Sequence, residues 1–151
     1  MIPSVAMFVT AYDASRVILV SIHLSGQMTD SDVDKVCSGI DVMAKAVADE
    51  KAEFATNIVL AEADSGPSAK QRKRIGEASK KLTHSFQAVV TDSAVIRAVA
   101  TAIRWFSQGD KHNVQKVLAT WPEARSWLVQ QTRHPADVLD ALVAEARRDA
   151  R

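Results

Sequence analysis

Apolar and polar positions in the first third of the chain follow two β-type runs and then a helical stripe. Residues 5–12 and 16–24 are rich in apolar and β-branched side chains, and a short polar connection separates them. Two such runs with so short a connection are typical of a hairpin. Thr29 is expected to begin a helix, with Asp32 completing a weaker form of the capping box. Apolar residues at helical spacing extend this helix to about residue 49.

The middle of the chain alternates between short apolar runs and a polar helical segment. Residues 57–61 and 87–91 predict buried strands, because each is a brief apolar run bounded by polar residues. Between them, Ser68 is expected to cap a helix that continues to about residue 85. This helix is basic and has only a thin apolar face.

The next segment predicts a very apolar helix followed by an ambiguous stretch. Ser93 is expected to begin the helix, most of which we expect to be buried, and Gly109 is expected to close it. Residues 114–119 fit a strand and a helix equally well. Thr120 and Glu123 then have the spacing of a capping box and predict the start of another helix.

The C-terminal end of the chain predicts one more helix. His134 and Pro135 end the preceding helix, and residues 136–148 have the pattern of an amphipathic helix with basic residues at its end. The order β-β-α-β-α-β-α-(β)-α-α is typical of an α/β fold with a mostly parallel sheet of four to five strands and helices packed on it. We expect an α/β domain over residues 1–132 and a helical extension over residues 133–151.

The composition is that of an ordinary globular chain. It has 151 residues, of which 47% are apolar and 25% charged, and this length suits one domain. Nineteen Lys and Arg residues face 18 Asp and Glu residues. A dedicated nucleic-acid reader usually carries a strong basic excess, so the near-neutral balance argues against that class.

Three features favour a cytoplasmic protein. Cys37 is the single cysteine and cannot form an internal disulfide, which fits a reducing compartment. No apolar run approaches the roughly 20 residues of a membrane span, and the N-terminus lacks a charged secretory leader. We therefore expect no integral membrane segment.

Charge is concentrated in the predicted helix after Ser68. Residues 68–81 carry six basic side chains and one acidic one, which leaves a net charge of +5. The basic residues are Lys70, Arg72, Lys73, Arg74, Lys80 and Lys81. Nucleic-acid binding calls for aromatic or amide readers, and only Gln71 lies among them. The thin apolar face also disfavours a membrane surface, so the helix is either simply solvated or binds an acidic protein partner.

Catalytic and metal-binding patterns are incomplete. The acidic run at residues 30–34 imitates the start of a calcium loop, but Lys35 stands where that loop needs glycine. The four histidines are widely spaced, and no Gly-x-Ser-x-Gly elbow is present. Cys37 lies on the apolar stripe of the first helix, where an inert thiol is expected. We expect no enzymatic activity, no metal and no cofactor.

The element order resembles the STAS family of anti-sigma factor antagonists. The resemblance covers about residues 5–131. It rests on the hairpin, on the strand and turn at residues 57–64, on the apolar strand and helix start at residues 88–93, and on the final helix motif at residues 121–128. It implies a mixed, mostly parallel sheet and a non-enzymatic role in a bacterial regulatory or assembly pathway.

The resemblance also identifies two candidate phosphorylation sites. In the signalling branch of the family, the third strand is followed by an Asp-Ser-Ser/Thr-Gly turn that is phosphorylated. The matching turn here reads Asp64-Ser65-Gly66-Pro67-Ser68, which lacks one residue of the motif and contains a proline. Ser65 is the positional match and Ser68 a second candidate. The alternative is that Ser68 only caps the helix and Ser65 only forms the turn.

These observations predict a protein-interaction module. Its expected contact region is residues 65–74, and Trp121 is a further candidate, either as an exposed contact or as a packed edge. The partner-binding candidates are Lys70, Arg72, Lys73, Arg74 and Trp121. One alternative is self-assembly into dimers or filaments through a sheet edge and the final helix. Another is carriage of a small apolar or lipid ligand in a pocket beside the sheet.

Overall fold

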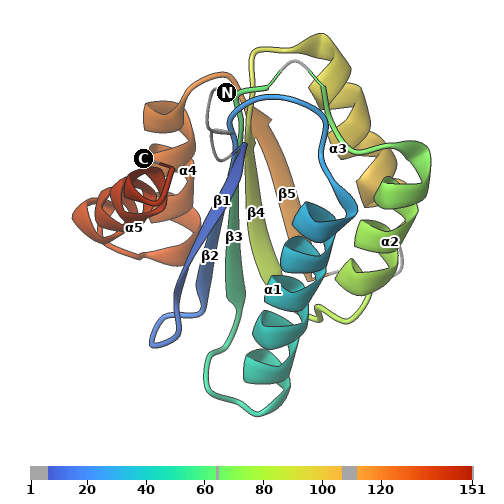
Figure 1. Cartoon of the computed structure of the whole chain (residues 1–151). Coiled ribbons are helices and arrows are strands. Elements are labelled where there is room, and N and C mark those ends of the chain that lie inside the picture. The colour runs from blue at the N-terminus through green and yellow to red at the C-terminus, as the bar shows by residue number, and fades with distance from the viewer. Residues whose placement is uncertain (1–6, 64, 107–111, 151) are drawn as a thin grey trace.

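The computed structural model describes residues 7–63, 65–106 and 112–150, and a five-stranded sheet lies at its centre (Figure 1). The strands are β1 (Phe8–Asp13), β2 (Ile18–His23), β3 (Ala55–Ala61), β4 (Ser85–Val90) and β5 (Asn113–Leu118), and they lie in chain order across the sheet. β1 pairs antiparallel with β2, whereas each later pair is parallel. The predicted hairpin and the mixed, mostly parallel α/β sheet are confirmed.

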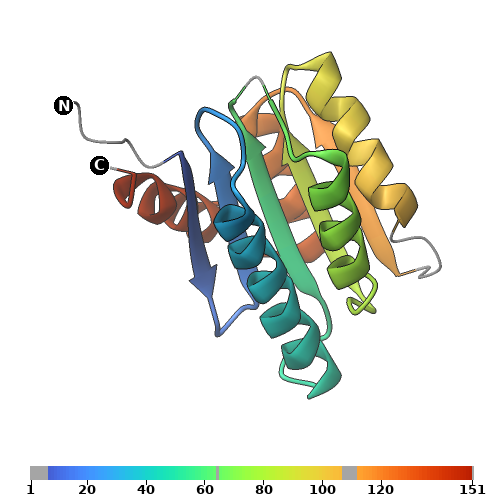
Figure 2. The same cartoon turned by 45° about the vertical axis from the view of Figure 1, so that its right-hand side comes forward.

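Helices cover both faces of this sheet. α1 (Asp30–Ala48), α2 (Ala69–Ser79) and α3 (Ala94–Phe106) connect successive parallel strands and lie together on one face (Figures 1 and 2). They share that face because the strands are added in one direction and crossovers between parallel strands are right-handed. α4 (Trp121–Thr132) and α5 (Ala136–Arg148) follow the last strand and cover the opposite face.

Local chemistry sets the start of the helices as predicted. Asp32 N donates to Thr29 Oγ1 at 3.1 Å, and Thr29 N donates to Asp32 Oδ2 at 2.9 Å, so the capping box before α1 is complete. Ser68 caps α2 in the same way with Gln71. Thr120 caps α4 by accepting from the backbone of Glu123.

Tertiary contacts settle or change three expectations from the sequence: the form of the ambiguous segment, the end of α2 and the burial of α3. Residues 113–118 form a strand because their backbone pairs with β4, which resolves the ambiguity of that segment. α2 ends at Ser79, since the chain turns there and Leu82 is buried before β4 begins. α3 is not mostly buried: Ile96 and Ala100 face the interior, but Val95 is 63% exposed on the outer side. Gly109 lies outside the described residues.

Two hydrophobic cores lie on the two sides of the sheet. The core under α4 and α5 joins Ile58 and Val20 of the strands to Leu128 and Leu139 of the helices. α5 therefore belongs to the same core as the sheet. The core under α1 and α2 joins Leu19 of β2 to Met43 of α1 and Ala78 of α2. None of the helices in the described residues is both long and apolar enough to cross a bilayer.

Candidate functional site

The loops that follow β2 and β3 meet at the carboxyl edge of the sheet. Ser65 Oγ donates to the carbonyl oxygen of Gly26 at 3.0 Å, and Gln27 Nε2 donates to that of Gly66 at 3.0 Å. Gly26 has a φ of +75°, a backbone conformation that strains residues with a Cβ, so glycine is favoured there. Ligand and partner sites of parallel sheets gather at this edge, which makes the joined loops a candidate site.

The two serine candidates are both engaged by neighbouring groups. Ser65 is half-buried and its hydroxyl contacts the adjacent loop. Ser68 is exposed, and its oxygen accepts from Gln71 N at 3.2 Å. Ser68 is therefore the N-cap of α2, which was the alternative to its being a phosphorylation site.

Much of the charge of α2 is matched by acidic residues. Arg74 pairs with Asp34 of α1 at 2.6 Å, and Lys81 pairs with Asp41 of α1 at 2.9 Å. Lys80 also lies 3.6 Å from Glu77. The net charge of +5 counted along this segment thus overstates the charge presented to a partner, and Arg74 is not a free cation.

The basic side chains of α2 that form no ion pair in the part of the chain that the structure describes lie in the first half of the helix. Lys70 and Lys73 are exposed and form no ion pair within the described residues. Arg72 donates to the carbonyl oxygen of Pro67 at 2.9 Å, so its head group is held against the preceding loop. We call the five residues Ser65, Ser68, Lys70, Arg72 and Lys73 the 65–73 surface.

Trp121 lies on the other face of the sheet and is packed between helices. It is half-buried, and its Nε1 donates to Asp140 Oδ1 at 2.8 Å. Arg125 contacts the same carboxylate at 3.0 Å. Burial acts to raise the pKa of Asp140, but the hydrogen bonds from Trp121 and Arg125 outweigh it and lower that pKa. Trp121 therefore has the geometry of a packed edge, and the structure does not bring it near the 65–73 surface.

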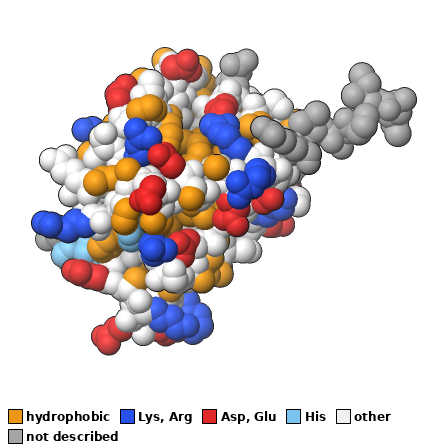
Figure 3. Space-filling view, turned by 90° about the vertical axis from the view of Figure 1, so that its left-hand side faces the viewer, with side chains coloured by type: hydrophobic (Ala, Val, Ile, Leu, Met, Phe, Trp, Pro, Cys, Tyr) orange, Lys and Arg blue, Asp and Glu red, His pale blue; other side chains and the backbone are white. Residues whose placement is uncertain are grey.

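The surface over α4 and α5 has no dominant charge. Figure 3 shows acidic and basic side chains interspersed with apolar ones on this face. Its ion pairs include Arg125 with Asp140 and Arg147 with Glu62. Such a mixed surface offers no charge signature for a particular class of partner.

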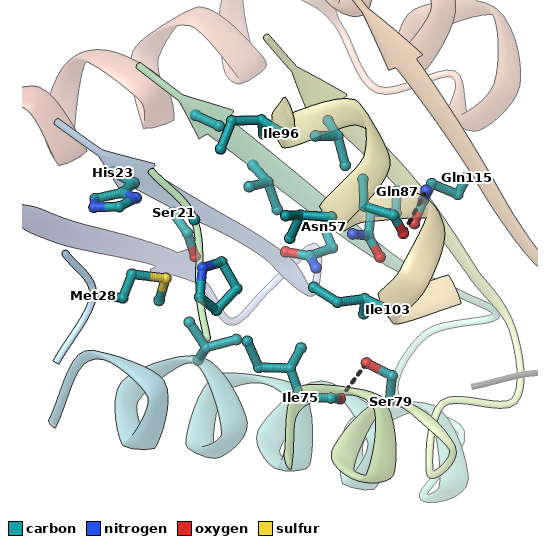
Figure 4. A pocket seen from close by; sticks show the side chains of 18 of the residues that line it. Ser21, His23, Met28, Asn57, Ile75, Ser79, Gln87, Ile96, Ile103 and Gln115 are labelled. Atoms are coloured by element: carbon teal, nitrogen blue, oxygen red, sulfur yellow. Dashed lines mark hydrogen bonds between the residues drawn. The ribbon is translucent and has the colours of Figure 1, made fainter. Parts of the chain in front are cut away.

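A cavity lies between the sheet and α1–α3, and none of its lining residues was assigned to a pocket from the sequence. It has a volume of about 100 Å³ and is lined by the three helices and by strands β1–β5 (Figure 4). Three amide side chains, Asn57, Gln87 and Gln115, stand in register on neighbouring strands and line it. In the sequence, each of these amides is a polar residue within or at the start of a short run that contains several apolar residues. That the three side chains are neighbours follows only from the strand register, which the sequence does not give.

Cys37 carries the single thiol of the chain. Burial raises the pKa of the Cys37 thiol, which keeps it protonated and unreactive. No group of three His, Cys, Asp or Glu residues in the described ranges could hold a metal ion.

Comparison of the chain with protein-family models, with curated proteins and with solved structures found no match.

Proposed function

We propose that this chain is a non-enzymatic, STAS-like protein-interaction module of the bacterial cytoplasm, and that it binds an acidic partner through the 65–73 surface. The observation that carries this proposal is the charge at the start of α2. Lys70 lies in the first turn and Lys73 in the second, and the first turn contains no acidic residue. A cation in the first turn of a helix opposes the dipole at a cost of about 0.3–1 kcal/mol, and Lys70 is in that position. A residue that destabilises its own helix in this way is expected mainly at functional sites.

The electrostatics of the 65–73 surface favour an anionic ligand group. The free N–H groups at the start of a helix and the positive end of its dipole attract carboxylates and phosphates. The two unpaired lysines add to that field, while Arg72 is already engaged with Pro67. Carboxylate-rich segments of another protein match this surface.

The strand order supports the STAS-like assignment. A hairpin precedes parallel strands in chain order, and the loop that contains Ser65 follows β3. A phosphate on Ser65 would displace its hydrogen bond to Gly26 and add negative charge beside the lysines. We propose that such a modification would weaken binding of an acidic partner, in a regulatory or assembly pathway.

Self-assembly through the sheet edge has less support. β5 is an edge strand, and its Val114 is 42% exposed. The exposed Lys116 lies two residues further along the same strand. A lysine in the middle of an edge strand discourages pairing with a second sheet.

Affinity capture from the native cell with three forms of the protein tests the proposal. Lys70→Glu/Lys73→Glu reverses the unpaired charges, and Lys80→Glu/Lys81→Glu makes the same charge change at the other end of the segment. We expect the wild type and the control pair to retain one stoichiometric acidic partner, and Lys70→Glu/Lys73→Glu to lose at least nine tenths of it. Equal capture by all three forms, or no stoichiometric partner for the wild type, would overturn the proposal.

A further inference from the structure

The cavity between the sheet and α1–α3 contains polar groups that the protein itself does not satisfy. Asn57 is 6% exposed, and its Oδ1 is buried without a hydrogen-bond partner. Gln87, its neighbour on β4, makes no side-chain hydrogen bond within the described residues, and Gln115 reaches only Ala100 O at 3.5 Å. A buried polar group without a partner costs about 1–3 kcal/mol. Asn57 Oδ1 is therefore available to an external partner, and the half-buried Gln87 amide lies beside it.

The rest of the cavity wall is mainly apolar. Ile75 of α2 and Ile96 and Ile103 of α3 line the cavity from the helix side, and Ile103 is the one that lies beside Asn57 (Figure 4). Gly66 and Pro67 of the β3–α2 loop close part of the same wall. No Asp, Glu, Lys or Arg lines the cavity in the described residues. A charged ligand would lose its hydration there without gaining a counter-charge, so the ligand is neutral.

The size and polarity of the cavity restrict the ligand further. A volume of about 100 Å³ is about two thirds of the roughly 150 Å³ of an apolar cavity that holds benzene, so the apolar body of a ligand can be no larger than a single ring. Adjacent parallel strands lie roughly 4.8 Å apart, so Asn57 and Gln87 present two amides side by side. A hydroxyl group between them can donate to one amide and accept from the other.

We propose that this cavity binds a small neutral molecule with a ring-sized apolar body and one hydroxyl group, which hydrogen-bonds the Asn57–Gln87 amide pair. The apolar body lies against Ile75, Ile96 and Ile103. This site is distinct from the 65–73 surface and does not depend on the proposed partner.

Titration of the full chain with phenol, followed by ¹H–¹⁵N correlation spectra, tests the site. We expect saturable shifts confined to residues around the cavity, with benzene binding at least fivefold more weakly and benzoate causing no saturable shift. Absence of saturable binding of phenol, or shifts centred on α4 and α5, would overturn the proposal and leave the cavity to water.

Matched substitutions identify the groups responsible. Asn57→Leu keeps the branched shape of the side chain and removes the amide, so, relative to the wild type, phenol should lose at least fivefold more affinity than benzene. Thr56→Val is the control: Thr56 Oγ1 is also buried without a partner, but it lies on the opposite face and outside the cavity. Equal phenol affinity in all three proteins would overturn the role of Asn57.

Two further variants keep the test decisive. Ala100→Leu adds bulk to the cavity wall and should reduce the affinity for phenol and benzene alike by at least tenfold. If Asn57→Leu loses its dispersed spectrum, Gln87→Leu at the half-buried neighbouring position replaces it with the same expected loss. Unchanged binding in Ala100→Leu would place the ligand elsewhere and contradict the proposal.

Discussion

Strand β3 shows how differently the two faces of the sheet are built. Its Ile58 and Leu60 point into the core under α4 and α5, where both are almost completely buried among apolar side chains. Its Asn57 and Val59 point to the opposite side and line the cavity under α1–α3. Val59 is half-buried although it lies on the central strand, because the helices on that side do not close over it.

This difference indicates that one face of the sheet mainly stabilises the fold and that the other is the candidate binding face. The face under α4 and α5 is packed mainly with apolar groups, which is how a sheet gains stability, and Thr56 Oγ1 is buried there without a partner. The face under α1–α3 keeps unsatisfied amides and empty volume, both of which cost stability. Such costs are expected where a protein binds something, and the 65–73 surface lies at the edge of this same face.

The largest effect should come from matched isoleucine truncations on the two faces. Ile58→Ala removes a fully buried side chain from the packed core and should lower the free energy of unfolding by about 3–5 kcal/mol. Ile96→Ala enlarges a cavity that already exists, and it gains helix propensity, so about 2 kcal/mol or less is expected. Urea unfolding of both variants measures this. Equal losses would contradict the difference between the faces.

Removing unpartnered polar groups should stabilise the protein by a smaller amount. Asn57→Leu and Thr56→Val each replace a buried polar atom that lacks a partner with an apolar one of similar shape. We expect each to raise the free energy of unfolding by about 1 kcal/mol in urea titrations without ligand. A loss of more than about 1 kcal/mol in Asn57→Leu would show that the amide is satisfied within the fold.

The contact between Trp121 and Asp140 should make a still smaller, pH-dependent contribution. The pKa of Asp140 is lower in the folded protein than its ordinary 3.8, so its contribution is present above that pH and is lost as the pH falls through 3.8 and below. Trp121→Phe should therefore lower stability by about 1 kcal/mol or less at pH 6 and by a smaller amount at pH 3. Thermal unfolding at both pH values measures this, and an effect independent of pH would contradict it.

The smallest effect is expected for the ion pair between α1 and α2. Arg74 and Asp34 are both substantially exposed, so Arg74→Ala should change the free energy of unfolding by less than about 1 kcal/mol. The effect should shrink further in high salt, because exposed ion pairs are screened. A salt-independent loss above that limit would show that Arg74 stabilises the helix layer by packing.

The sequence predicted those parts of the fold that depend on neighbouring residues. Thr29, Ser68 and Thr120 cap their helices as expected, because a cap involves only three or four consecutive residues. Residues 114–119 stayed ambiguous because an edge strand is defined by its pairing with β4, which the local pattern does not contain.

The candidate site was less predictable because its contacts join distant segments. Arg74 meets Asp34 across 40 positions, and this pairing turns part of an exposed charge run into a bridge between helices. Asn57 and Gln87 become neighbours only through the strand register. The sequence did predict the loop that contains Ser65, since a turn after a buried strand is a local signal.

Hydrogen exchange of the wild type with and without its captured partner tests most directly the claim that function lies on the α1–α3 side and its carboxyl edge. We expect added protection in the loop after β2 and in residues 65–76, and no change over α4 and α5. Protection confined to α4 and α5, with none at residues 65–76, would contradict this account.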